Sequence, residues 1–130
     1  MAVIEGTDRL KMAVGEYDFA VDGGAVGTIT LRGGGVLGGG FPSGAVVVNG
    51  YIEVDTVLTS GGAATVAVGS EATGDIQAAA VVTGAPWSTT GRKQVAFSGA
   101  KTTTGTRALT ATIAAATLTA GKFRVVILYR

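Results

Sequence analysis

Apolar and polar residues alternate along most of this 130-residue chain, and glycine-rich turns interrupt the alternation at short distances. The pattern is clearest in the ranges 19–32, 57–70 and 109–130. A period of two residues is typical of strands that bury one face. The pattern predicts an all-β fold, a two-sheet, jelly-roll-like β-sandwich of about eight short strands with at most one short helix.

The same pattern divides the chain into two parts. Residues 1–15 mix charged and apolar side chains without a clear period, which predicts an N-terminal arm or an edge strand. From residue 16 the alternation predicts a single β-sandwich domain over 16–130, and the length of the chain also favours one domain.

A first hairpin is expected near the start of this domain. Tyr17, Phe19 and Val21 alternate with acidic or small residues and would share one face of a strand. The sequence Asp-Gly-Gly at 22–24 is a turn signal, and a second strand with Ile29 pointing inward follows it.

A second hairpin is expected from the run 45–59, a turn at 60–62 and a strand at 64–68. Gly50 inside the long run indicates a bulge or bend. The positions expected to face the core are Ile52, Val54, Thr56 and Leu58, and those expected to face outward are Tyr51, Glu53, Asp55 and Val57.

Segment 71–82 is the one place where the sequence supports a helix. Asp75 would cap it, and the residues that follow have good helix propensity. Val81 and Val82 favour a strand instead, so both alternatives stay open. Trp87 follows in a loop, where we expect it to fill one end of the core.

The C-terminal strand is apolar on both faces. After a turn expected at 119–122, one face carries Phe123, Val125, Ile127 and Tyr129, whereas Val126 and Leu128 lie on the other. A strand of this kind is either central in its sheet or covered by a partner.

The composition predicts a thin core, so we expect the chain to gain stability by associating with neighbouring subunits. Hydrophobic residues make up 47% of the chain, but aromatic residues make up 6%, and there are 22 glycines. A net charge of +1 with scattered basic residues argues against nucleic-acid binding. The N-terminus lacks the pattern of a signal peptide and no apolar run is long enough to span a bilayer, so no membrane partner is expected.

The residue types exclude most catalytic chemistry. The chain has no histidine and no cysteine, so we expect no metal, no cofactor and no enzymatic activity. The carboxylate pairs Glu16/Asp18 and Glu53/Asp55 are typical of a solvated sheet face. A formal GxGxxG motif at 33–38 lacks the helix that would hold a dinucleotide. The threonine-rich run 102–106 is either a polar turn or a ligand-contacting loop.

Four phrases in a fixed order resemble the head decoration, or capsid cement, proteins of tailed bacteriophages. They are YDFAVDGGAVGTITL at 17–31, VVVNGYIEVDTVLTSGGAATVAVGS at 46–70, GDIQAAAVV at 74–82 and LTATIAAATLTAGKFRVVILY at 109–129. Each phrase alone carries little information, but together they cover most of the chain after residue 16. The resemblance implies a β-sandwich bound to the outer surface of the virion.

The resemblance also implies a mechanical role and partners. The protein would be made in the host cytoplasm, associate as a homo-oligomer with a trimer favoured, and bind the major capsid protein, which it would stabilise. The N-terminal arm and the glycine-rich loop are the expected contact segments, since arms can add a strand to a neighbouring sheet. The expected contact residues are Ile4, Arg9, Lys11, Val36, Leu37 and Phe41.

Three alternatives remain open. The protein could be a phage tail component or another accessory virion protein. It could be a carbohydrate- or protein-binding module, for which Tyr51 and Trp87 are the candidate aromatic platforms. A hydrolase would rely on Glu53 and Asp55.

Overall fold

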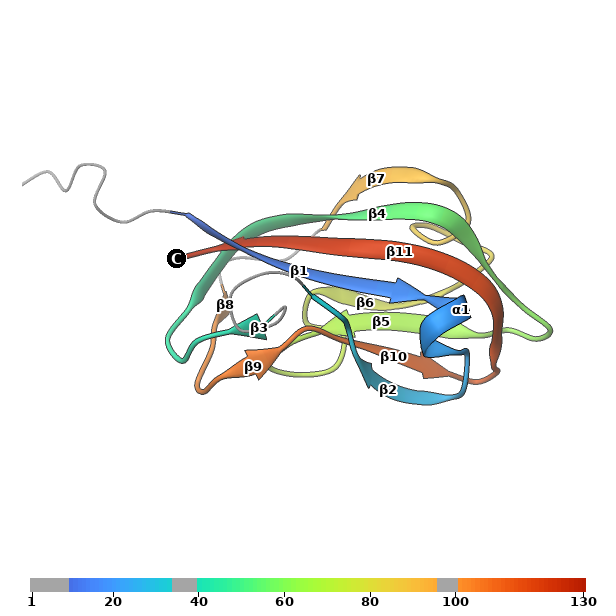
Figure 1. The fold of residues 1–130 in the computed structure, drawn as a ribbon, viewed down its shortest axis with the longest axis horizontal. Helices are drawn as coiled ribbons and strands as arrows, with labels where there is room; N and C mark the ends of the chain where they lie inside the picture. The colour runs from blue at the N-terminus through green and yellow to red at the C-terminus, as the bar shows by residue number, and fades with distance from the viewer. Residues whose placement is uncertain (1–9, 34–39, 96–100) are drawn as a thin grey trace, which may run out of the picture.

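Two antiparallel sheets pack face to face and enclose the core between them (Figure 1). The computed structural model describes residues 10–33, 40–95 and 101–130. The five-stranded sheet has the order β1 (Lys11–Asp18), β11 (Leu118–Tyr129), β4 (Val46–Ser60) and β7 (Gly91–Gln94), and β8 (Lys101–Thr102) also pairs with β4. The four-stranded sheet has the order β2 (Gly27–Thr30), β10 (Thr110–Ala114), β5 (Thr65–Gly69) and β6 (Gln77–Val81).

A third, two-stranded sheet lies at one end of the sandwich (Figure 1). It consists of β3 (Gly40–Phe41) and β9 (Arg107–Ala108). One helical turn, α1 (Phe19–Asp22), follows β1. The predicted all-β, two-sheet sandwich with at most one short helix is therefore confirmed.

Aromatic side chains concentrate in the core, which compensates for their small number. Trp87 is fully buried, and its ring lies 4.7 Å from that of Phe123, which stacks on Tyr17 at 5.3 Å. Phe41 meets Tyr129 edge-on at 5.2 Å near the other end of the sandwich. The Trp87 indole N–H donates to the Val66 carbonyl, so its polar atom is satisfied within the core.

The C-terminal strand is central in the five-stranded sheet, as its two apolar faces predict. β11 pairs with β1 on one side and with β4 on the other. The four residues expected on its inner face, Phe123, Val125, Ile127 and Tyr129, are all buried. The expected turn at 119–122 is wrong, because this segment belongs to β11 and contains register shifts instead.

The expected first hairpin does not form. Asp18 ends β1 by accepting a hydrogen bond from the Ala20 backbone N–H, while Asp22 accepts one from the Asp18 N–H. These two carboxylates close the helical turn α1, which carries the chain from the five-stranded sheet to the four-stranded sheet. Phe19 and Val21 therefore lie in α1 and not on the strand with Tyr17.

The expected second hairpin is wrong for the same topological reason. β4 and β5 lie in different sheets, so the Ser-Gly-Gly segment at 60–62 connects two layers. Thr56 is exposed although its parity predicted a core position, because the register of β4 against β11 shifts between Val54 and Thr56. The extra residue, Asp55, reverses the alternation there.

Gly50 marks a close approach and not the bulge that the sequence predicted. A Cβ atom at Gly50 would lie 2.5 Å from Cδ1 of Ile127, so the neighbouring side chain occupies that space. The register shift in this part of β4 falls between Val47 and Asn49.

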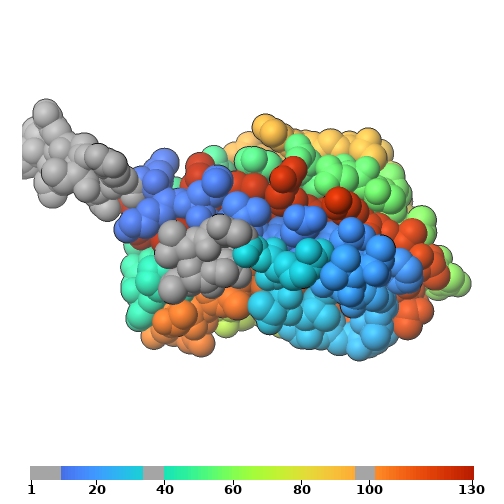
Figure 2. Space-filling model, in the orientation of Figure 1, coloured from blue at the N-terminus to red at the C-terminus, as the bar shows by residue number. Residues whose placement is uncertain are grey.

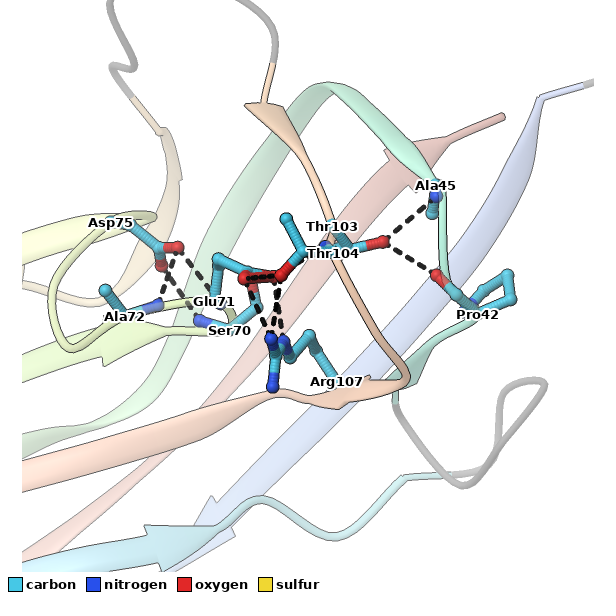
Figure 3. Close-up of polar contacts among 9 residues, drawn as sticks. All are labelled: Pro42, Ala45, Ser70, Glu71, Ala72, Asp75, Thr103, Thr104 and Arg107. Atoms are coloured by element: carbon cyan, nitrogen blue, oxygen red, sulfur yellow. Dashed lines mark hydrogen bonds and ion pairs between the residues drawn. The ribbon is translucent and has the colours of Figure 1, made fainter.

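Segment 71–82 takes the strand alternative. β6 pairs with β5 over Gln77–Val81. Asp75 does act as a cap, but for a loop: its carboxylate accepts hydrogen bonds from the backbone N–H groups of Ser70, Glu71 and Ala72 (Figure 3). No helix in the described residues is long and apolar enough to cross a membrane.

Candidate interaction surface

The two sheets differ sharply in charge. Every Asp, Glu, Lys and Arg that lies on a described strand belongs to the five-stranded sheet or to β9. The four strands of the four-stranded sheet, GTIT, TVAVG, QAAAV and TATIA, carry no charge. The molecule therefore presents two outer faces of different chemistry.

One line of alternating charge crosses the outer face of the five-stranded sheet. The strand register aligns Glu16 with Arg124, Arg124 with Glu53, and Glu53 with Arg92. These four side chains, which we call the charged row, come from β1, β11, β4 and β7 in that order. Glu53 holds the centre, since its carboxylate accepts from Arg92 at 2.8 Å and from Arg124 at 2.6 Å.

The charged row makes Glu53 an unsuitable general acid. The hydrogen bonds from Arg92 and Arg124 hold the pKa of the Glu53 carboxyl below its usual range. The other acid proposed for hydrolysis, Asp55, is exposed in the bulge of β4. No cluster of metal-binding side chains occurs among the described residues. The contacts of Glu53 are thus ion pairs with Arg92 and Arg124.

An apolar patch lies beside the charged row on the same face. The register aligns Met12 with Leu128, and Val14 with Val126 and Tyr51. These five residues form the apolar patch, in which Met12 keeps 52% of its surface exposed and Val126 keeps 5%, because its neighbours cover it. In the space-filling view β1 lies at the surface between β11 and β2, so its outward side chains are accessible (Figure 2).

A shallow hollow of about 290 Å³ adjoins the apolar patch on the side of β4 and β7. It is lined by Asn49, Gly50, Tyr51, Arg92, Gln94 and Leu128. Aromatic, methionine and arginine residues are enriched in protein interfaces, so this combination is typical of a contact surface.

Tyr51 and Trp87 do not form aromatic platforms for a sugar. The Arg92 guanidinium lies over the Tyr51 ring at 5.0 Å from its centroid, and Trp87 is fully buried. Sugar stacking needs an open ring face, which Trp87 does not present, and Arg92 occupies one face of Tyr51.

The outer face of the four-stranded sheet carries threonines in place of charges. Thr28 and Thr30 on β2 lie opposite Thr112 and Thr110 on β10, and the hydroxyls of Thr28 and Thr112 share a hydrogen bond of 3.0 Å. We call this surface the uncharged face. A surface without charges loses little free energy of solvation when a partner covers it.

The threonine-rich run 102–106 forms part of an internal polar network (Figure 3). Glu71 accepts hydrogen bonds from the Thr104 backbone N–H, the Thr104 hydroxyl and the Arg107 guanidinium. These donors lower the pKa of the Glu71 carboxyl to about 2, with the Arg107 hydrogen bond as the largest cause. The network ties the loop after β5 to the loop before β9.

Thr103 connects the same run to the end of the sandwich (Figure 3). Its hydroxyl donates to the Pro42 carbonyl at 2.7 Å and accepts from the Ala45 backbone N–H at 3.0 Å. Its side chain is buried, and Thr104 is already engaged with Glu71. Thr103 and Thr104 therefore stabilise a turn, which is the first of the two alternatives.

The expected contact residues lie in different settings. Lys11 is exposed at the start of β1, opposite Tyr129. Phe41 has an exposed fraction of 0%, and its ring packs against Tyr129, so the structure places it in the core and not at a contact surface. The remaining four, Ile4, Arg9, Val36 and Leu37, lie outside the described residues.

Sequence reasoning missed the apolar patch as a surface. The sequence pattern places Met12 in the N-terminal arm or edge strand and puts Val126 and Leu128 on the second face of the last strand, but it does not identify their neighbours. The missing information was the register of β1 against β11, which turns separate apolar positions into one patch.

No family model and no curated protein matches the sequence. The fold is similar to that of chains in solved phage capsid structures. A chain of the cyanophage Pam1 capsid asymmetric unit has a TM-score of 0.66 at 21% identity, covering 99% of this chain and 90% of the other. A chain of the acidic stable capsid structure of Helicobacter pylori bacteriophage KHP30 has a TM-score of 0.64 at 20% identity, with 94% and 87% covered.

A chain of the capsid of Ralstonia phage GP4 has a TM-score of 0.61 at 19% identity, and the match covers 98% of this chain and 87% of that one. In all three matches most of both chains is covered, so the matched chains are similar to this one in length. The likeness shows a common fold: this chain has the same β-sandwich as subunits of similar size in three phage capsid structures.

Proposed function

We propose that this protein is a non-enzymatic structural component of a phage virion, which binds the outer surface of the assembled capsid and stabilises it. The observation that carries the proposal is the fold likeness to three chains from phage capsid structures over nearly their whole length. The four sequence phrases that resemble decoration proteins support the same role independently.

The size of the matched chains favours a decoration role over a role as the shell itself. The matches pair this chain with whole subunits of similar length, and not with one domain of a larger shell protein. A single thin sandwich suits an added subunit that covers a preformed surface.

The mechanism follows from linkage. A subunit that binds the assembled shell more tightly than free shell protein shifts the equilibrium toward the shell. Many copies on one shell multiply a modest binding free energy. No catalytic group is needed for this effect.

The uncharged face of the four-stranded sheet is the surface that fits contact with the shell best. Covering it removes no charged strand residue from water, whereas a partner that covers the charged row must supply complementary charges. Five expected contact residues stay predictions: Ile4, Arg9, Lys11, Val36 and Leu37.

The test is co-sedimentation of the purified protein with purified phage heads that lack it. Saturable, stoichiometric binding that raises the resistance of the heads to heat supports the proposal. Absence of binding to mature heads contradicts it and favours a tail or other accessory virion protein, which binding to isolated tails would then identify.

A further inference from the structure

The charged row is complementary to itself when its order is reversed. From β1 to β7 it reads Glu16, Arg124, Glu53 and Arg92, which is negative, positive, negative and positive. Reversing the row places a positive charge opposite each negative one. A two-fold axis that runs along the strands between β11 and β4 produces this reversal when a second copy packs on the same face.

We propose that the outer face of the five-stranded sheet is the interface of a two-fold symmetric dimer of this chain. The axis exchanges β1 with β7 and β11 with β4 between the two copies. Glu16 then lies opposite Arg92 of the second copy, and Arg124 lies opposite Glu53 of the second copy. Each of these pairs occurs twice by symmetry.

The apolar patch is complementary under the same axis. Tyr51 on β4 lies opposite Val126 on β11 of the second copy, since both belong to the same row of the register. Val126 is 5% exposed, so Tyr51 supplies most of the apolar surface of this pair. Met12 lies on β1, so the exchange with β7 places it over the hollow of the second copy, which lies on the side of β4 and β7. The exposed side chain and the hollow thus have matching positions on one face.

The size of the face predicts a reversible dimer. Four strands of up to about eight residues present roughly 500 Å² in projection, compared with about 800 Å² per partner in a standard interface. Sheets that pack face to face keep their strands within about 30° of each other, which an axis along the strands permits. We therefore expect dissociation in the micromolar range and no obligate association.

The favoured trimer implied by the resemblance is a different arrangement. A three-fold ring uses two different surfaces of each subunit, whereas the charged row is complementary to its own copy. The proposal concerns the free protein and does not depend on binding to a capsid.

The experiment is sedimentation velocity of the full chain over a concentration series, with thermal melting to verify that each variant is folded. Met12→Lys places a positive charge against the hollow, which Arg92 lines, and is expected to weaken the dimer at least about tenfold. Val26→Lys is the matched control, because Val26 is 56% exposed and precedes β2 in the other sheet. The control variant should sediment with the same oligomeric mass as wild type.

A charge exchange tests the two-fold geometry itself. Glu16→Arg alone and Arg92→Glu alone each place like charges opposite one another and should weaken the dimer. The double variant restores opposite charges at both ends of the row, so the dimer should recover.

A wild-type protein that stays monomeric to about millimolar concentration would overturn the proposal. An oligomer whose mass in sedimentation is the same for wild type and Met12→Lys would also overturn it. Folded single variants that dissociate without recovery in the double variant would overturn the two-fold pairing.

Discussion

Glu71 is the carboxylate with the most hydrogen-bond donors in the loop network at one end of the sandwich, where Thr104 and Arg107 surround it. Its pKa is lowered from 4.5 to about 2 in the folded protein. A lowered pKa contributes stability that is complete above the unfolded value and is lost as the pH falls toward the folded value. Glu71 therefore contributes to stability above pH 4.5, and this contribution disappears between pH 4.5 and about 2.

We predict that Glu71→Gln lowers the urea midpoint near neutral pH and that its difference from wild type shrinks as the pH falls from 4.5 toward 2. Chemical denaturation at a series of pH values measures this. Glu16→Gln is the control, because the ion pair of Glu16 with Lys122 is long at 3.9 Å. A Glu71→Gln difference that stays constant over this pH range would contradict the assigned role.

Thr103 has a buried hydroxyl with two partners, so removing it leaves both without their hydrogen bond. Thr103→Val keeps the shape of the side chain but cannot bond the Pro42 carbonyl or the Ala45 N–H. We predict a loss of about 1–3 kcal/mol in the free energy of unfolding. Thr103→Ser keeps the hydroxyl, so its free energy of unfolding should fall less than that of Thr103→Val. Equal losses in the two variants, measured by denaturant unfolding, would show that the methyl group matters more than the hydrogen bonds.

At the scale of elements, the sequence predicts strands well where the alternation is uninterrupted. The inner face of β11 and the buried position of Trp87 follow directly from the pattern of apolar residues. The partners of the strands do not follow, because Asp22-Gly23-Gly24 is equally compatible with a hairpin and with a connection between sheets. The carboxylates of Asp18 and Asp22 stabilise α1 and so favour the connection between sheets. Their effect depends on hydrogen-bond geometry that the sequence does not reveal.

Bulges limit sequence reasoning for a related reason. One extra residue at Asp55 interrupts the alternation of β4 and exposes Thr56, whereas Leu58 is buried as its parity predicts, because a second register shift follows. The charged row could not be predicted from the sequence, because its four residues lie on four strands. They form one line only through the strand register. The sequence predicts that Glu53 and Tyr51 face outward but not which cations accompany them.

Gly121 is the one glycine of β11, and its replacement should destabilise this strand directly. Its φ is +145°, and an added Cβ would lie 2.8 Å from Cγ of Leu58. We predict that Gly121→Ala destabilises the fold by about 1–3 kcal/mol through crowding and backbone strain. Gly61→Ala is the control, since a Cβ there meets no atom within 4 Å. Similar unfolding midpoints for the two variants would show that β11 relaxes around the added methyl group.

At the scale of the whole molecule, charge is divided between two layers that share one core. In the five-stranded sheet Glu53 pairs with Arg92 and Arg124, and these charged groups suit a face that is in contact with water. The four-stranded sheet has no charge on any of its strands, and its edge strands are short or bulged. Short and bulged edges disfavour edge-to-edge pairing, so the uncharged face itself is the more suitable contact of this layer.

This division predicts that a single charge on the uncharged face weakens binding to the capsid. Thr112 lies on β10, in the middle of that face between Thr28 and Ala67. We predict that Thr112→Lys lowers the affinity for phage heads at least about tenfold, because the lysine must lose water or hold the surfaces apart. Co-sedimentation with heads measures the affinity, and Thr90→Lys in the exposed loop before β7, in the other sheet, is the control for net charge. If wild type and both variants bind equally, the shell contacts another surface, and the decoration role survives without this face.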